Sequence, residues 1–244
     1  MSERLAPSDP LSSSPLDVFH RLFKPHPWHG VPLGEGAPER VNVFIEIVPT
    51  DTVKYELEKE TGYLTVDRPQ KYSNVCPSLY GFLPRTHCGE RVAELCRSRT
   101  GRDEIAGDGD PMDVCVLSEK AFSHGDLFLK AIPIGGFRMI DGAEADDKIV
   151  AVLEGDATYG SLRELSDVPR PLLERLKHYF LTYKQAPGAE REEVEIPQTY
   201  GRSEAYEVIE RSREDYQRLY GELPEKLIAG LRRLDGAGGG EGGA

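Results

Sequence analysis

Strand-like segments fill residues 41–152 of this 244-residue sequence, and helical patterns begin only after residue 168. The strand-like segments are short, rich in β-branched and aromatic residues, and separated by turn-forming dipeptides. They are 41–48, the residues around 55, 63–66, 114–117, 127–134 and 149–152, with turns expected at 51–52, 61–62, 108–109, 135–136 and 141–142. Their intervals are too irregular for a repeat. This arrangement predicts a closed or nearly closed antiparallel barrel.

Three helices are expected after the strands. In the first, apolar residues recur at three- and four-residue steps from Leu172 to Tyr183, between two prolines and Pro187-Gly188. The second begins near Ser203, an expected N-cap, and ends before Gly221, and a shorter third helix covers 224–234. Strands followed by helices predict the α+β class.

The two ends of the chain differ in composition from the part between them. Residues 1–40 are rich in proline, serine and glycine and read as an extended arm, whose aromatic residues dock either on the core or on a neighbouring molecule. The last 24 residues, 221–244, are expected to form a short helix and a flexible glycine-rich tail. The chemistry is therefore expected within 41–220.

The charge of the chain limits its partners. A formal net charge of −12 disfavours nucleic acid, which is normally bound by a basic surface. The same excess of carboxylates suits hard cations with oxygen ligands, and a bound cation could bring in a small anionic substrate. The four cysteines contain no C-x-x-C pair, and no apolar run is long enough to cross a membrane, so a reducing cytoplasmic setting without a membrane is expected.

Residues 108–113, Asp-Gly-Asp-Pro-Met-Asp, are the strongest local signal for chemistry. Three carboxylates in six residues repel one another unless a cation or a proton neutralises them. In isolation the motif reads about equally well as a solvated turn.

A second acidic group, Asp141, Glu144, Asp146 and Asp147, precedes Lys148 and another strand. Alone it would be a charged hairpin loop, but two acidic loops that each lead into a strand could meet at one end of a barrel and hold Mg²⁺.

Cationic residues form a third group. Lys54 and Glu56 lie on the same face of an expected strand, where such a pair is usually an exposed ion pair. Next to a metal cluster, however, Lys54 and the nearby Arg68 could bind phosphate oxygens. Lys184 follows Tyr183 in the last turn of the first helix, where a lysine often serves only to complement the helix C-terminus.

Seven segments in order resemble the family I soluble inorganic pyrophosphatases. They are 44–47 (Phe-Ile-Glu-Ile), 54–56 (Lys-Tyr-Glu), 66–68 (Val-Asp-Arg), 80–82 (Tyr-Gly-Phe), 108–113, 141–148 and 183–184 (Tyr-Lys). The resemblance spans roughly residues 41–215. It implies a five-stranded OB-like β-barrel with flanking C-terminal helices, and Mg²⁺-dependent hydrolysis of pyrophosphate to two phosphates by direct attack of a metal-activated water.

The resemblance also implies roles for individual residues. Those expected to hold several Mg²⁺ ions are Asp108, Asp113 and Asp146 as direct ligands, Asp141 beside Asp146, and Glu46 and Glu56 mostly through water. Those expected to bind phosphate oxygens or line the site are Lys54, Arg68, Tyr80, Lys148, Tyr183 and Lys184. Asp110 would orient and deprotonate the attacking water. Family members form hexamers or dimers, so a homo-oligomer is expected.

Two departures from the family pattern affect the expected site. Cys76 stands where the family commonly has a tyrosine, so a hydroxyl is missing unless Tyr72 reaches in. The connection over 85–107 is also longer than in compact bacterial members. The competing hypothesis is a barrel that binds a metal or a phosphorylated ligand without turnover, or an OB-like nucleic-acid module. The latter would need a basic groove with aromatic residues, which the motifs do not supply.

Overall fold

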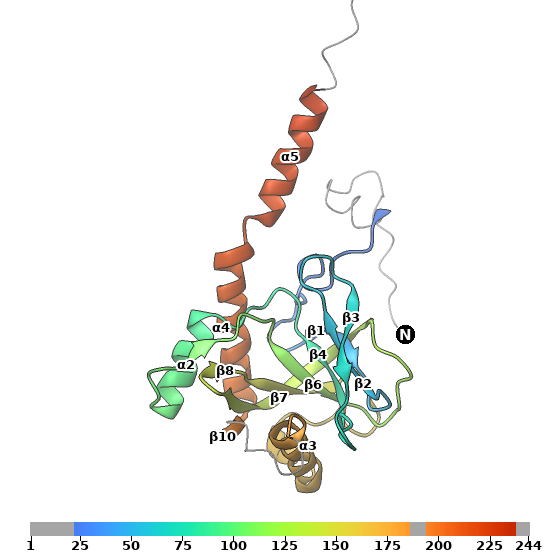
Figure 1. The fold of residues 1–244 in the computed structure, drawn as a ribbon, viewed down its shortest axis with the longest axis vertical. Coiled ribbons are helices and arrows are strands. Elements are labelled where there is room, and N and C mark those ends of the chain that lie inside the picture. Colours follow the sequence, from blue (N-terminus) through green and yellow to red (C-terminus); the bar gives the residue numbers. More distant parts are fainter. Residues whose placement is uncertain (1–21, 186–193, 238–244) are drawn as a thin grey trace, which may run out of the picture.

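The computed structural model describes residues 22–185 and 194–237 (Figure 1). Within them, five strands form a closed hydrogen-bonded ring. In ring order they are β1 (Val41–Ile47), β4 (Leu79–Phe82), β6 (Asp113–Leu117), β9 (Lys148–Leu153) and β7 (Leu127–Asp141), which pairs back to β1. Val41 lies opposite Ala131, and Ile45 lies opposite Leu127, where the ring closes.

One pairing in the ring corrects the expectation of an antiparallel sheet. β6 and β9 run parallel, with Asp113 opposite Lys148, whereas the other four ring pairings are antiparallel. Parallel neighbours need a crossover connection, and β7 lies within the segment that links β6 to β9. The sheet is therefore mixed, and together with the helices it confirms the α+β class.

Strand β7 is longer than predicted and runs through the expected turn at 135–136. A Cβ atom on Gly135 would lie 2.5 Å from the Tyr200 carbonyl oxygen, and one on Gly136 would lie 2.5 Å from the Tyr200 ring. These glycines therefore allow β10 (Val194–Gly201) to approach β7 closely, with Tyr200 opposite Gly136. β10 also interrupts the expected helical half of the chain.

The remaining strands lie outside the ring. β2 (Val53–Leu57) and β3 (Leu64–Pro69) form a separate hairpin. β5 (Ala106–Gly107) and β8 (Glu144–Ala145) are two-residue strands that extend the sheet beyond β7. The hairpin and the β5 edge flank the loop that carries the aspartates of 108–113.

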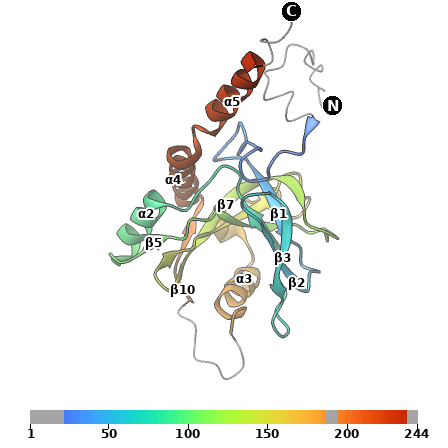
Figure 2. The same cartoon turned by 45° about the horizontal axis from the view of Figure 1, so that its top comes forward.

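Three helices correspond to the predicted ones. They are α3 (Arg170–Thr182), α4 (Arg202–Tyr220) and α5 (Leu223–Ala237). α4 begins one residue before Ser203, which is therefore not its N-cap, and the Glu164 carboxylate accepts a hydrogen bond from the Arg202 amide at 3.2 Å instead. α5 projects away from the body of the molecule (Figures 1 and 2).

Helix α2 (Glu90–Thr100) was not predicted, and it forms the middle of the 85–107 connection. Its buried residues are Val92, Ala93, Leu95 and Cys96, and all of them except Ala93 belong to the main core cluster together with residues of α4. Figures 1 and 2 show α2 and α4 side by side on one flank of the sheet. The longer connection is therefore a packed helix rather than a loop.

The described part of the N-terminal arm docks on the core. Trp28 is 2% exposed and packs in a cluster with Phe44, Leu57, Phe82 and Tyr216. The rest of the arm, 1–21, and most of the glycine-rich tail lie outside the described residues.

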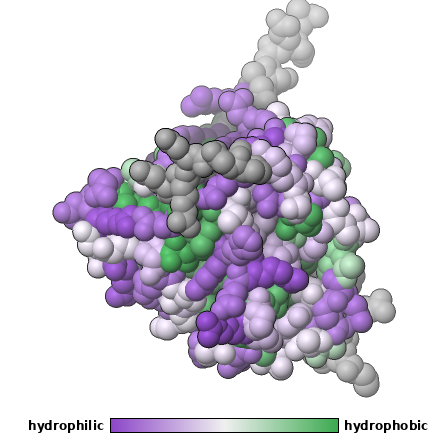
Figure 3. All heavy atoms as spheres, turned by 60° about the horizontal axis from the view of Figure 1, so that its bottom comes forward, coloured by the Kyte–Doolittle hydropathy of each residue, from purple (hydrophilic) through white to green (hydrophobic). Residues whose placement is uncertain are grey.

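The face brought forward in Figure 3 is mainly hydrophilic, with hydrophobic side chains in small separate patches. This surface agrees with the high charge content of the chain. None of the helices in the described part of the chain has the length and apolar composition that crossing a bilayer requires.

Candidate active site

Strand register brings two of the acidic motifs together at one end of the ring. Asp113 is the first residue of β6 and lies opposite Lys148, the first residue of β9. Asp146 comes two residues before Lys148, at the start of the β8–β9 connection. Lys148 is only 3% exposed, and its ammonium contacts the carboxylates of both Asp113 and Asp146. The parallel β6–β9 pairing therefore creates the centre of the site.

Tyr80 closes one side of this centre from the neighbouring strand β4. Its hydroxyl donates to Asp113 Oδ2 at 2.6 Å. The Asp113 carboxylate thus receives hydrogen bonds from both Tyr80 and Lys148. Tyr72, by contrast, is 65% exposed, and Cys76 is fully buried. Tyr72 is also not among the residues that line the pocket described below.

The β2–β3 hairpin brings its cations to the opposite wall. Lys54 Nζ lies 3.0 Å from Glu56 Oε2 and 2.8 Å from Asp67 Oδ2, and Arg68 donates to the same Asp67 oxygen at 2.6 Å. Glu46, on β1, is buried and accepts a hydrogen bond from the Leu57 amide at 2.7 Å. This bond holds the hairpin against the ring.

The end of α3 supplies the last group. Tyr183 follows the helix directly, and the Arg68 guanidinium lies 6.0 Å from the centre of its ring. Lys184 forms an ion pair with Asp141 at the end of β7. Through Arg68, this group adjoins the β2–β3 hairpin.

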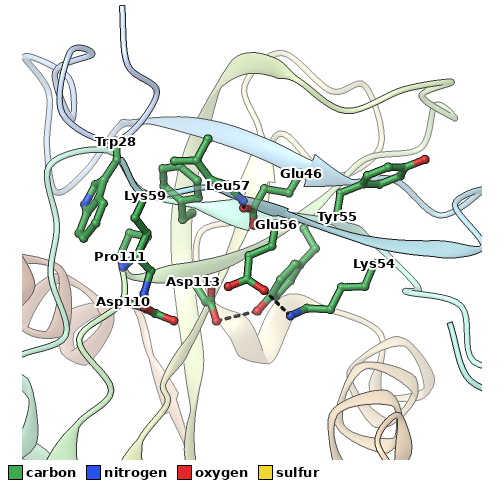
Figure 4. A pocket seen from close by; sticks show the side chains of 12 residues that line it. Trp28, Glu46, Lys54, Tyr55, Glu56, Leu57, Lys59, Asp110, Pro111 and Asp113 are labelled. Carbon is green, nitrogen blue, oxygen red and sulfur yellow. Dashed lines mark hydrogen bonds and ion pairs between the residues drawn. The ribbon is translucent and has the colours of Figure 1, made fainter. Parts of the chain in front are cut away.

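These walls enclose a small pocket with a volume of about 80 Å³ (Figure 4). Its lining residues are Trp28, Glu46, Lys54, Tyr55, Glu56, Leu57, Lys59, Tyr80, Phe82, Asp110, Pro111 and Asp113. Six of the predicted site residues line it directly. Asp146 and Lys148 join it through Asp113, and Asp108 accepts a hydrogen bond from the Asp110 amide at 2.9 Å. Arg68, Asp141, Tyr183 and Lys184 lie beyond the lining.

The other six lining residues were not predicted as site residues, and two of them, Lys59 and Trp28, bring a charge and a large ring to the pocket. The Lys59 ammonium contacts the Asp110 carboxylate across the pocket, and Trp28 reaches the pocket wall from the N-terminal arm. In Figure 4, Asp110 and Asp113 lie below the hairpin that carries Glu56 and Lys59. Lys59 lies just past the Lys54–Glu56 strand, so its sequence position is a weak signal. The sequence position of Trp28 gives no indication that it reaches the pocket, because that contact depends on how the N-terminal arm folds back onto the core.

Burial and mutual repulsion make the carboxylates of this site hard to ionise. Burial raises the pKa of Glu46 to about 8, with Asp113 and Glu56 adding repulsion. Burial, and then the Asp146 charge, raise the pKa of Asp108 well above its usual range. Burial likewise raises the pKa of Asp146, although the Lys148 ammonium partly opposes the effect. A cation at this site would relieve these costs.

The donor chemistry at this site fits a hard divalent cation. The carboxylates of Asp108, Asp113 and Asp146 influence one another electrostatically, and the atoms that they offer to a metal ion are all oxygens. Within 22–185 and 194–237, no three His, Cys, Asp or Glu side chains converge into a ready-made metal cage. Lys148 lies between Asp113 and Asp146, and its ammonium balances their negative charge where a cation would do so.

The comparisons with known proteins decide which family this site belongs to. The family model described as inorganic pyrophosphatase matches residues 43–217. The chain belongs to the inorganic pyrophosphatase family. This membership confirms the resemblance drawn from the seven segments and the enzyme class that it implied.

Individual inorganic pyrophosphatases agree over most of the chain. The Chlamydia muridarum inorganic pyrophosphatase is 49% identical over 214 residues, which cover 86% of this chain and all of that protein. The crystal structure of the Thermus thermophilus inorganic pyrophosphatase matches with a TM-score of 0.64 and 27% identity, covering 77% of this chain and 97% of the other. The Helicobacter pylori inorganic pyrophosphatase matches with a TM-score of 0.63 and 30% identity, covering 77% and 98%.

Proposed function

We propose that this chain hydrolyses inorganic pyrophosphate to two orthophosphates in a Mg²⁺-dependent reaction, by direct attack of water. The observation that carries the proposal is the convergence of carboxylates and cationic side chains on one pocket of an inorganic pyrophosphatase family member. A small pocket with both signs of charge suits a compact, highly charged anion held together with cations.

We assign the metal ions to the carboxylates at the end of the ring. Asp108, Asp113 and Asp146 would be direct ligands, and Asp141 would hold a further ion beside Asp146. Glu46 and Glu56 would act mostly through water. When bound, Mg²⁺ lowers the pKa of a water molecule and neutralises phosphate charge.

Asp110 is proposed to be the general base. Its carboxylate faces the pocket, and its side chain is 41% exposed, so water can reach it. The Asp108 carboxylate accepts a hydrogen bond from the Asp110 amide at 2.9 Å, which fixes the backbone turn that carries Asp110. Asp110 would orient the attacking water and accept its proton.

The cationic side chains and the tyrosines are proposed to bind phosphate oxygens. Lys54 and Arg68 approach from the hairpin, and Lys148 approaches from the ring. Tyr183 and Lys184 approach from the end of α3, and Tyr80 lines the centre. Arg68 offers the bidentate fork that suits a phosphate, whereas the lysines act as point charges.

The wider setting follows from the same proposal. The five-strand ring would be the OB-like barrel of the family, within a catalytic domain over 41–220, with 1–40 as the arm and 221–244 as the tail. The substrate is a small molecule. We infer a cytoplasmic homo-oligomer that acts without nucleic acid or a membrane.

The alternative is a barrel that binds a metal or a phosphorylated ligand without turnover. Phosphate release from pyrophosphate, measured with and without Mg²⁺, separates the two. Release that requires Mg²⁺ supports hydrolysis. Binding of pyrophosphate without release, by fresh folded protein across a range of Mg²⁺ concentrations, would support the binding module.

Ca²⁺ is expected to inhibit the Mg²⁺-supported reaction. Ca²⁺ accepts the same oxygen ligands, but with longer bonds and a looser, higher-coordinate shell, which would misalign the groups around the water. Turnover is measured at fixed Mg²⁺ while Ca²⁺ is raised to a comparable concentration. Unchanged turnover would count against the assigned ligands.

Lys59→Met is expected to lower kcat/KM for pyrophosphate about 3- to 10-fold, because it removes one half-exposed positive charge from the pocket wall and keeps the side-chain stem. Lys226→Met is the matched control, since Lys226 is an exposed lysine on α5 paired with Glu222. Equal kcat/KM values for the two variants would show that Lys59 takes no part in the reaction.

A further inference from the structure

Asp147 is the acidic residue of the 141–148 motif that is buried outside the site. It is 1% exposed, although its sequence neighbours Asp146 and Lys148 contact each other in the site, where Lys148 also contacts Asp113. Successive side chains of an extended segment alternate in direction, so Asp147 lies on the opposite face. No role in metal or phosphate binding accounts for a carboxylate buried there.

Its partners form a buried polar network that joins three elements. The Arg138 guanidinium, from β7, is fully buried and lies 3.3 Å from Asp147 Oδ2. The Tyr200 hydroxyl, from β10, donates to the same oxygen at 3.0 Å. Arg138 also pairs with Glu204 of α4, and its guanidinium carbon lies 5.1 Å from the centre of the Tyr200 ring.

The network reaches the site through the short segment between β8 and β9. The Asp146 amide donates to the Met139 carbonyl at 3.0 Å, and Lys148 lies opposite Phe137 in the register. Met139 and Phe137 flank Arg138 on β7. The backbone on either side of Asp147 therefore pairs with Met139 and Phe137 of β7, and the Asp147 side chain pairs with Arg138, which lies between them.

We propose that the Arg138–Asp147 pair is a positioning device for Asp146 and Lys148 in the reaction proposed above. Anchoring the Asp147 side chain to the far face fixes the direction of its two neighbours. A shift of this segment would move a proposed metal ligand and a proposed phosphate-binding group together.

The cost of the pair supports a positioning role. Burying two charges is expensive, and well-packed apolar residues in their place are often as stabilising or more so. Among the described residues, Asp147 Oδ1, Arg138 Nε and Arg138 Nη1 have no hydrogen-bond partner, so Nη1 meets Asp147 Oδ2 as an ion pair without a hydrogen bond. The hydrogen-bonding capacity of this buried ion pair is therefore only partly used. The stability of the fold does not by itself require such a pair.

The test compares Mg²⁺ binding and stability in five proteins: the intact chain, Asp147→Asn, Arg138→Lys, the double variant Arg138→Met/Asp147→Leu, and Asp215→Asn. Asp215 is the matched control, a buried carboxylate that accepts hydrogen bonds from amides at the start of α2, such as that of Arg91 at 2.9 Å, and that is not among the residues lining the pocket. Mg²⁺ affinity of the substrate-free proteins is measured by calorimetry, kcat by phosphate release, and stability by thermal unfolding in EDTA.

Asp147→Asn and the double variant are expected to bind Mg²⁺ about tenfold more weakly or worse, with lowered kcat, as for other groups that orient metal ligands. The double variant should unfold at a temperature no lower than the intact chain. Asp215→Asn should lose stability and keep its Mg²⁺ affinity. Arg138→Lys, which keeps the charge, should fall between the intact chain and the double variant.

Two results would overturn the proposal, and they separate a failure of the positioning role from a failure of the assigned metal site. If the intact chain binds Mg²⁺ and the double variant binds it equally well with normal kcat, the pair is structural only. If the intact chain itself binds no Mg²⁺, the assigned metal site is wrong, and there is nothing for the pair to position.

Discussion

Asp110→Asn is expected to lower turnover by about 10²- to 10⁴-fold while Mg²⁺ and pyrophosphate binding survive. The amide keeps the size of the side chain and can still hydrogen-bond the water, but it cannot take the proton. Lys59 is the cation that contacts Asp110 in this structure. Losing that ion pair at the pocket mouth costs little stability, because both side chains are over 40% exposed.

Asp113→Asn is the contrasting variant. The Asp113 carboxylate accepts hydrogen bonds from Tyr80 and Lys148, so the amide would lose both charge and ligand strength at the centre of the site. Its activity should recover in part as Mg²⁺ is raised, whereas that of Asp110→Asn should not. Turnover measured against Mg²⁺ concentration separates the two. Full recovery of Asp110→Asn at high Mg²⁺ would mean that Asp110 is another ligand and not the base.

Without divalent cations, the folded protein is expected to lose on the order of 2 kcal/mol of stability between pH 6.5 and 8. Burial raises the pKa of Glu46 to about 8 and raises that of Asp108 in the same direction. In this window the unfolded chain has already released both protons and the folded chain still holds them. The folded state therefore binds more protons, and the free energy of unfolding falls as the pH rises.

Three partly buried histidines act in the opposite direction, and mainly at the lower end of this window. Burial lowers the pKa of His29 to about 4 and lowers those of His26 and His87 as well. Their contribution to stability grows as the pH rises through the unfolded histidine pKa of about 6.5 and is nearly complete about one pH unit above it. The upper part of the window therefore reports the buried carboxylates.

Mg²⁺ should reverse the loss, because it binds the ionised carboxylates and stabilises the folded state more as the pH rises. Chemical unfolding in EDTA and in excess Mg²⁺, at several pH values from 6.5 to 8, checks both statements. Glu46→Gln should flatten the slope seen in EDTA. A stability in EDTA that stays level or rises over this range would contradict the assigned burial costs.

Local patterns were sufficient for the elements whose stability depends on nearby residues. The prolines and the apolar spacing around Leu172–Tyr183 predicted α3, and the β-branched runs predicted β1, β6 and β9. α2 was missed because its four buried residues sit among arginines and glutamates, and they become a core face only against α4. The predicted turn at Gly135-Gly136 was wrong because glycine there serves close packing against Tyr200 rather than a reversal of the chain.

The chemistry of this protein was determined by the sequence alone, because its carboxylates and cations lie in short motifs whose order identifies the family. The contacts between those motifs were decided only by the tertiary structure. The parallel register of β6 and β9 sets Lys148 between Asp113 and Asp146, and the folded-back arm and hairpin bring Trp28 and Lys59 to the pocket. Burial of Asp147 against Arg138 is a contact of the same kind. Such pairings join residues far apart in the chain, and they depend on strand register and packing, which no local stretch of residues encodes.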